Sequence, residues 1–221
     1  METLTITIPG FVIINGYMGS GKSHLIKWLV HKYRKQFDYA VVFCNTSFAG
    51  DSFKYIDPKF IHPTYEEEKL IAIMDLQADL VKQGVKKNCL LIMDDCLDDN
   101  QFKSPPFKRL CTQLRHYNIT CIISCQYPNA IPPRFRTNAF QSAIFFMGTE
   151  KALKALYESY GQMFETFRDF KGFVMKNTGN YNFILYDSKN LSPKIEDKYK
   201  VYCCPVKIPN FTLTIKAKIK Q

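Results

Sequence analysis

The segment from Phe11 to Ser23 constrains the fold of this chain more than any other. Residues Phe11–Ile14 form a continuous apolar run, typical of a strand that is buried on both faces. The turn that follows is Gly16-Tyr17-Met18-Gly19-Ser20-Gly21-Lys22-Ser23, which fits the pattern G-x-x-x-x-G-K-[ST]. A random chain of this length would match that pattern on the order of once in a hundred. An amphipathic helix is predicted directly after it, from about Lys22 to Lys35.

Each residue type in this turn suits the binding of phosphate. The glycines let the backbone fold so tightly that successive N–H groups point at phosphate oxygens, and the helix adds its positive end. Lys22 places a cation at the β- and γ-phosphates, and the Ser23 hydroxyl can ligate Mg²⁺. The sequence therefore predicts a nucleotide-binding loop. We assign its contacts to Gly16, Gly19, Ser20, Gly21, Lys22, Ser23 and His24.

Strands and helices are expected to alternate along most of the chain. Further buried strands are predicted over residues 39–44, 89–93, 119–124 and 143–147, with a short strand at 3–8 and a late one at 181–186. Helices are predicted from a capping box at Thr64 and Glu67 to Lys82, from Ser104 onward, and over 150–160 and 162–175. This alternation favours an α/β fold with a mostly parallel sheet.

The composition limits the class of partner. Lys and Arg number 30 against 20 Asp and Glu, which gives a net charge of +10 and favours polyanions, meaning nucleic acid or an acidic membrane face. The eight cysteines form no metal-binding spacing and are expected to be reduced. No apolar run approaches the roughly 18 residues that cross a bilayer, so no transmembrane segment is expected. The N-terminus lacks the pattern of a signal peptide, which predicts a protein that is not secreted.

A pair of carboxylates follows the strand at 89–93. Asp94 and Asp95 end this apolar run, at the position where P-loop NTPases hold the metal. Asp94 is predicted to hold Mg²⁺. Asp95 lies where a residue that activates the attacking water is often found, although aspartate is one methylene shorter than the glutamate common there. The alternative is a pair of solvated acids at the end of a strand.

Three further polar residues are candidates for catalysis. Gln126 follows the strand at 119–124, where an amide can sense the γ-phosphate, or it is simply a polar strand end. Arg134 and Arg136 lie on a proline-rich loop, Ile131-Pro132-Pro133-Arg134-Phe135-Arg136-Thr137-Asn138. Either guanidinium could reach a neighbouring subunit's nucleotide as an arginine finger. Each could equally be a surface cation or a contact to DNA phosphate.

Taken together, these motifs resemble those of a known group of ATPases. In order, the chain carries GYMGSGKS, LLIMDD, RHYNIT, IISCQ and PPRFRTN. The set is similar to the DNA-packaging ATPases of the FtsK–HerA superfamily, in the branch found in large eukaryotic DNA viruses and virophages. The distinctive part is the RHYNI stretch before a strand ending in Gln, followed by P-x-R-x-R-x-N. The likeness covers roughly residues 8–190.

The resemblance implies a RecA-like P-loop fold, with helices flanking a sheet of central strand order 5-1-4-3-2. It also implies an ATPase ring of five or six copies that pulls double-stranded DNA into a preformed capsid. The implied partners are capsid or portal vertex proteins. The implied location is the virion or a virus factory of the host cell. The resemblance also assigns a role to each matching residue. Lys22 and Ser23 would bind ATP and Mg²⁺, Asp94 the metal, and Asp95 would be the catalytic carboxylate. Gln126 would sense the γ-phosphate, and Arg136 or Arg134 would be the arginine finger, with Arg136 slightly favoured.

Two alternatives and a domain division accompany this interpretation. A small nucleotide kinase or a signalling GTPase would share the loop, and an ATP-dependent scaffold or DNA-binding module would bind nucleotide without turnover. The guanine-specific motif N-K-x-D of GTPases is absent.

Residues 1–190 are expected to form the P-loop ATPase domain and residues 191–221 a basic C-terminal appendage. From Pro193 onward there are seven Lys against two acids.

Overall fold

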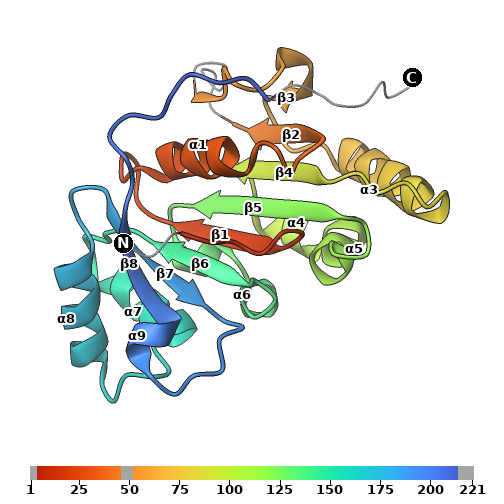
Figure 1. Cartoon of the computed structure of the whole chain (residues 1–221). Helices are drawn as coiled ribbons and strands as arrows, with labels where there is room; N and C mark the ends of the chain where they lie inside the picture. Colours follow the sequence, from red (N-terminus) through yellow and green to blue (C-terminus); the bar gives the residue numbers. More distant parts are fainter. Residues whose placement is uncertain (1–3, 46–51, 214–221) are drawn as a thin grey trace.

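The computed structural model describes residues 4–45 and 52–213 and shows a mixed α/β architecture (Figure 1). In this described part, one sheet of eight strands runs in the order β3-β2-β4-β5-β1-β6-β7-β8. The strands are β1 (Phe11–Asn15), β2 (Tyr39–Cys44), β3 (Ile61–His62), β4 (Cys89–Asp94), β5 (Ile119–Cys125), β6 (Gln141–Ile144), β7 (Asn182–Asp187) and β8 (Tyr199–Cys203).

Helices and short 3₁₀ turns connect these strands. The helices are α1 (Lys22–Tyr33), α3 (Glu67–Lys82), α4 (Asp99–Lys103), α5 (Pro105–Gln113), α6 (Pro133–Arg136), α7 (Glu150–Tyr160), α8 (Phe167–Asn177) and α9 (Ile195–Lys198), and the 3₁₀ turns are η1 (Pro58–Phe60) and η2 (Pro128–Ala130). No helix among the described residues is both long and apolar enough to span a membrane.

The predicted RecA-like order is confirmed at the centre of the sheet. Numbered in chain order, the five expected strands are β1, β2, β4, β5 and β6, and they lie as β6-β1-β5-β4-β2, all parallel. The full sheet is wider than that order. A short parallel strand, β3, extends one edge, and the antiparallel strands β7 and β8 extend the other.

Helices cover both faces of the sheet because its central strands are apolar on both. Val12 and Ile14 of β1 pack with α1 on one face, whereas Phe11 and Ile13 pack with α3 and α5 on the other. A third apolar cluster joins α7 and α8 to β6 and β7, and Figure 1 shows these two helices gathered at the β6–β8 end of the sheet. Every residue of β1 is buried, as the continuous apolar run predicts.

The register aligns the carboxyl ends of the central strands. Asp94 of β4 pairs with Ser124 of β5 on one side and with Cys44 of β2 on the other. Asn15 of β1 pairs with Cys125 of β5. The loops that leave β1, β4 and β5 therefore start at one edge of the sheet, where open α/β sheets bind their ligands.

Two local predictions were wrong. Residues 4–8 form no strand, because side chains bind their backbone: Tyr33 Oη accepts from the Ile6 amide at 3.1 Å, and Gln141 Oε1 accepts from the Thr7 amide at 3.2 Å. The capping box at Thr64 is absent as well. Helix α3 starts at Glu67 after Glu66, whose carboxylate instead accepts a hydrogen bond from Lys69 at 2.9 Å.

Part of the expected basic appendage contributes to the sheet. Residues Tyr199–Cys203 form β8, which pairs with β7 along its length. Beyond it, the Leu213 amide donates to the Tyr55 carbonyl at 2.7 Å, so the chain crosses back to the region before β3. Residues 214–221, which carry three of the lysines of this tail, lie outside the described residues. The division into an ATPase domain of residues 1–190 and an appendage of residues 191–221 stays a prediction.

Candidate nucleotide-binding site

The glycine-rich turn connects β1 to α1 and requires glycine at three positions. Gly19 and Gly21 have φ of 81° and 107°, in the left-handed region that side chains disfavour. A Cβ on Gly16 would lie 2.3 Å from Ser20 Oγ, which is too close. Ser20 is buried, and its Oγ has no hydrogen-bond partner among the described residues. The loop therefore holds a buried hydroxyl that is free to bind a ligand beside its backbone amides.

Lys22 is the first residue of α1, and its ammonium is held inside the loop. Its side chain is only 6 % exposed. Nζ donates to the Gly16 carbonyl at 2.9 Å and to the Tyr17 carbonyl at 3.4 Å, and lies 3.2 Å from Asp95 Oδ2. Each contact lies within the loop or at the acidic pair, so the cation lies at the point where these two segments meet.

Asp94, the last residue of β4, is a buried carboxylate surrounded by hydroxyl donors. Ser23 Oγ donates to Oδ2 at 3.1 Å, and Ser124 Oγ donates to Oδ1. The Cys44 thiol lies 3.9 Å from Oδ2. Burial raises the pKa of Asp94 above its usual value, and the charge of Asp95 acts in the same direction, whereas the hydroxyl donors and Lys22 oppose the shift. The carboxylate would gain a strong partner from a cation.

Asp95 turns away from the strand and towards Lys22. Its φ of 48° is uncommon for a residue with a side chain, and such conformations gather at functional sites. Gln126 Nε2 donates to Asp95 Oδ2 at 3.3 Å. Both residues line a hollow of about 240 Å³ that also borders Ser124 and Tyr127. The hollow can admit water next to the carboxylate and the amide.

The donor set fits a magnesium ion held in part by phosphate. No group of three or more His, Cys, Asp or Glu side chains that could hold a metal exists in residues 4–45 and 52–213. Ser23 and Asp94 nevertheless place a hydroxyl and a carboxylate 3.1 Å apart beside the loop. Mg²⁺ takes oxygen ligands and commonly uses one or two protein groups together with phosphates and water. Ser23 and Asp94 therefore suit a magnesium ion that is also bound by phosphate and water. They do not suit an ion that is held by protein groups alone.

The two arginines lie apart from this cluster. Arg134 Nη2 donates to the Phe102 carbonyl at 2.6 Å, and its guanidinium lies over the Phe135 ring. Arg136 Nη1 donates to the Pro128 carbonyl at 3.1 Å. Within the described residues, neither arginine bonds to the loop or to the acidic pair of the same chain. Their predicted role in a neighbouring subunit stays a prediction.

His24 follows Ser23 on the first turn of α1 and contacts the far end of the chain. Its Nε2 lies 2.7 Å from the Pro205 carbonyl oxygen, just after β8. The ring is therefore engaged by this carbonyl. The contact of His24 with a nucleotide stays a prediction.

Sequence reasoning did not identify two neighbours of the metal candidate. Ser124 and Cys44 lie directly beside Asp94 because β5 and β2 flank β4 in register. The predicted strand order already made the strands that end near residues 44 and 124 neighbours of the strand that ends at Asp94. It did not say which of their residues lie beside the carboxylate, because that depends on the register of the strands.

This geometry defines a class of protein. A glycine-rich loop leads from β1 into a helix beginning with Lys-Ser. A buried aspartate at the end of β4, which β5 separates from β1 in the sheet, contacts that serine. These are the parts of a P-loop NTPase with a RecA-like sheet.

The comparisons with known proteins identify the family. The family model described as Poxvirus A32 protein matches residues 6–150. Protein 075L of Invertebrate iridescent virus 6 is 30 % identical over 184 residues, covering 80 % of this chain and 70 % of the relative. Protein L437 of Acanthamoeba polyphaga mimivirus is 30 % identical over 204 residues, which cover 86 % of this chain and 70 % of that relative. The chain belongs to the Poxvirus A32 protein family and is a P-loop ATPase, as its motifs predict.

Solved structures share the fold. The genome packaging NTPase B204 of Sulfolobus turreted icosahedral virus 2, in complex with AMP, has a TM-score of 0.65 at 14 % identity. The match covers 89 % of this chain and 98 % of the B204 chain. B204 of Sulfolobus turreted icosahedral virus, described as a DNA-packaging ATPase, has a TM-score of 0.63 at 20 % identity, with coverages of 89 % and 98 %. These matches support the RecA-like architecture.

Proposed function

We propose that this protein is an ATP-driven motor that moves double-stranded DNA into a preformed viral capsid, with Mg²⁺-dependent hydrolysis in a ring of five or six copies. The observation that carries the proposal is the meeting of Lys22, Ser23, Asp94 and Asp95 at one edge of the sheet. Family membership supports packaging, and the related fold of B204, whose structures contain AMP or ATP analogues, supports nucleotide binding.

In this proposal the loop and the acidic pair divide the work of hydrolysis. The loop amides and Lys22 hold the phosphates, while Ser23 and Asp94 hold Mg²⁺, which neutralises charge on the phosphate oxygens. Asp95 and Gln126 orient the attacking water, and Asp95 accepts its proton. Lys22 pairs with Asp95 at 3.2 Å. A bound triphosphate competes for that ammonium, so it frees the Asp95 carboxylate to face the water.

The position of the arginines supports the ring in this proposal. Both guanidinium groups bind carbonyls of their own chain. Among the described residues, Lys22 is therefore the cation that pairs with the acidic pair. Phosphoryl transfer gains greatly from an arginine supplied in trans, because that charge stabilises the transition state. We propose that Arg136, or Arg134 in its place, enters a neighbouring subunit's site. Hydrolysis then depends on assembly.

The net charge of +10 suits a grip on DNA phosphates. Contacts from Lys and Arg to phosphate carry no sequence information, and a motor that moves any genome requires such contacts. The proposed partners are therefore duplex DNA, further copies of this chain and proteins of the capsid vertex. The proposed location is the virion or the virus factory of the infected cell.

The test is whether duplex DNA stimulates hydrolysis. Purified protein is incubated with ATP and Mg²⁺, with and without a long DNA duplex, and released phosphate is measured. We expect turnover that depends on Mg²⁺ and rises with DNA, and no turnover in a Lys22→Ala control. Transfer of phosphate to an added nucleoside or nucleotide would identify a kinase instead. Assembly with ATP but without phosphate release would identify a scaffold.

A further inference from the structure

A second hollow borders the phosphate loop on the side of β6 and β7, away from the acidic pair. Its volume is about 220 Å³. Gly19 and Ser20 of the loop form one side of it, and the turn of residues 179–182 that leads into β7 forms another. The hollow therefore shares the loop with the phosphate site, but it is lined by none of the side chains to which hydrolysis has been assigned.

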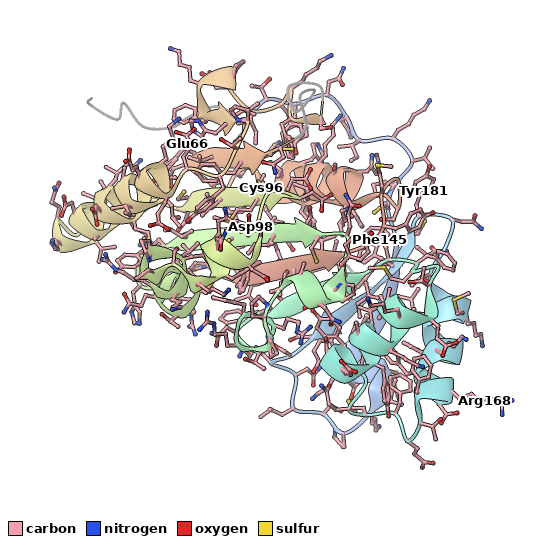
Figure 2. All side chains as sticks on the ribbon, turned by 180° about the vertical axis from the view of Figure 1, so that it is seen from behind. Glu66, Cys96, Asp98, Phe145, Arg168 and Tyr181 are labelled. Carbon is pink, nitrogen blue, oxygen red and sulfur yellow. The ribbon has the colours of Figure 1, made fainter. Side chains whose placement is uncertain are left out.

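Aromatic side chains line this hollow. Tyr17 and Phe146 lie edge to face, with ring centroids 6.1 Å apart. The Tyr181 ring lies against the loop itself, since its Cδ1 is 3.1 Å from the place that a Cβ on Gly21 would occupy. In Figure 2, Tyr181 and Phe145 lie close together at the end of the sheet where the loop joins α1. Tyr181 is nevertheless 59 % exposed, so much of its ring is open to a ligand.

An unusual backbone holds Tyr181 in this position. Gly179, Asn180 and Tyr181 have φ of 112°, 48° and 63° in succession. A bulky residue rarely adopts this region, and such a conformation persists only where the surroundings enforce it. Two hydrogen bonds hold the turn: the Asn182 amide donates to the Gly179 carbonyl at 2.8 Å, and the Cys204 amide donates to the Tyr181 carbonyl at 3.3 Å.

We propose that this hollow binds the base of the nucleotide whose phosphates occupy the loop, with Tyr181 as the stacking residue. The inference rests on the proposed binding of a triphosphate by the loop. One ribose joins base and phosphates, so the base must lie beside the loop, and this aromatic hollow adjoins it. Stacking accepts any base, and a purine offers the larger face. The amides of Asn180 and Asn182 supply donors and acceptors for its edge.

The experiment separates the base from the phosphates. Binding of ATP, CTP and inorganic tripolyphosphate to the full-length protein is measured by calorimetry with Mg²⁺ present. Tyr181→Ala is expected to weaken ATP binding about tenfold, since stacking of a base on an aromatic ring has that magnitude. The same variant should leave tripolyphosphate binding unchanged and should reduce the preference for ATP over CTP. Tyr181→Phe, which keeps the ring, should bind ATP like the wild type.

Two controls keep the result interpretable. Tyr181→Asn removes the ring with a residue that tolerates positive φ, so it should reproduce the Tyr181→Ala result without backbone strain. Met175→Ala changes a side chain of comparable exposure on α8 and should change neither affinity. Unchanged ATP affinity in both ring-deleting variants, or an equal loss for ATP and tripolyphosphate, would overturn the inference. Failure of the wild type to bind either ligand would refute the phosphate site and this hollow together.

Discussion

Replacing Lys22 by methionine tests whether the buried ammonium is present for a ligand or for the fold. Methionine keeps most of the apolar stem and removes only the charged donor. Nζ donates to the Gly16 carbonyl at 2.9 Å and pairs with Asp95 at 3.2 Å. A hydrogen bond from a charged group contributes about 1.5–3 kcal/mol net, and a partly exposed ion pair contributes about 1 kcal/mol or less. Asp95 is 26 % exposed, so water can solvate its carboxylate once the partner is gone.

The expected loss is therefore about 2–3 kcal/mol of unfolding free energy, out of a typical total of about 5–15 kcal/mol. At about 2–4 °C per kcal/mol for a chain of this size, the melting temperature should fall by about 4–12 °C while the fold survives. Removing a positioned charge from a phosphoryl-transfer site costs far more in rate, on the order of 10²–10³.

Circular dichroism on heating and in urea measures the first effect, and phosphate release with ATP, Mg²⁺ and DNA measures the second. A folded Lys22→Met protein with turnover reduced at least a hundredfold is expected on this reasoning. Wild-type turnover in the folded variant would refute the assignment of Lys22 to the phosphates. Complete unfolding would show that the lysine is required for the core.

Three further expectations concern the finger, the metal carboxylate and the grip on DNA. Arg136→Ala should bind ATP normally but hydrolyse it slowly, and mixing it with Asp95→Asn protein should restore some turnover; no rescue at any mixing ratio would exclude a finger in trans. Asp94→Asn should raise the melting temperature of the nucleotide-free protein at pH 7, because burial raises the pKa of Asp94 and so makes its charged form costly in the folded state. The wild type regains this stability as the pH falls through the raised pKa, so the gain of the variant should shrink on acidification, and a constant gain would contradict the cause. DNA affinity should fall steeply and log-linearly with salt as counterions are released, whereas a flat response in a filter-binding titration would exclude a phosphate grip.

The loop and the central strands were predictable because their signals are local. The run Phe11–Ile14 is apolar at every position, which is typical of a strand buried on both faces. The glycines at 19 and 21 follow from the turn, because their positive φ excludes most other residues. The failure at residues 4–8 has a long-range cause. Residues 4–8 alternate like a strand, but the Tyr33 and Gln141 side chains bind their amides instead.

The partners of the acidic pair required the tertiary structure. Asp94 meets Ser124, 30 residues away in sequence, because β4 and β5 pair in one particular register. The Lys22–Asp95 pair depends on the left-handed turn at Asp95, which no pattern in the chain reveals. Tyr181 is further still from the loop along the chain, and it reaches Gly21 only because β7 and β8 complete the sheet beyond β6.

The order of residues along the chain was thus enough to define a phosphate loop, a parallel core and the class of chemistry, because backbone conformation and burial on both faces restrict which residue types can occupy neighbouring positions. It could not define which side chains surround the nucleotide. Those contacts join residues from separate strands, and their distances depend on strand register, on the added edge strands and on the packing of helices against both faces, which only the folded protein determines.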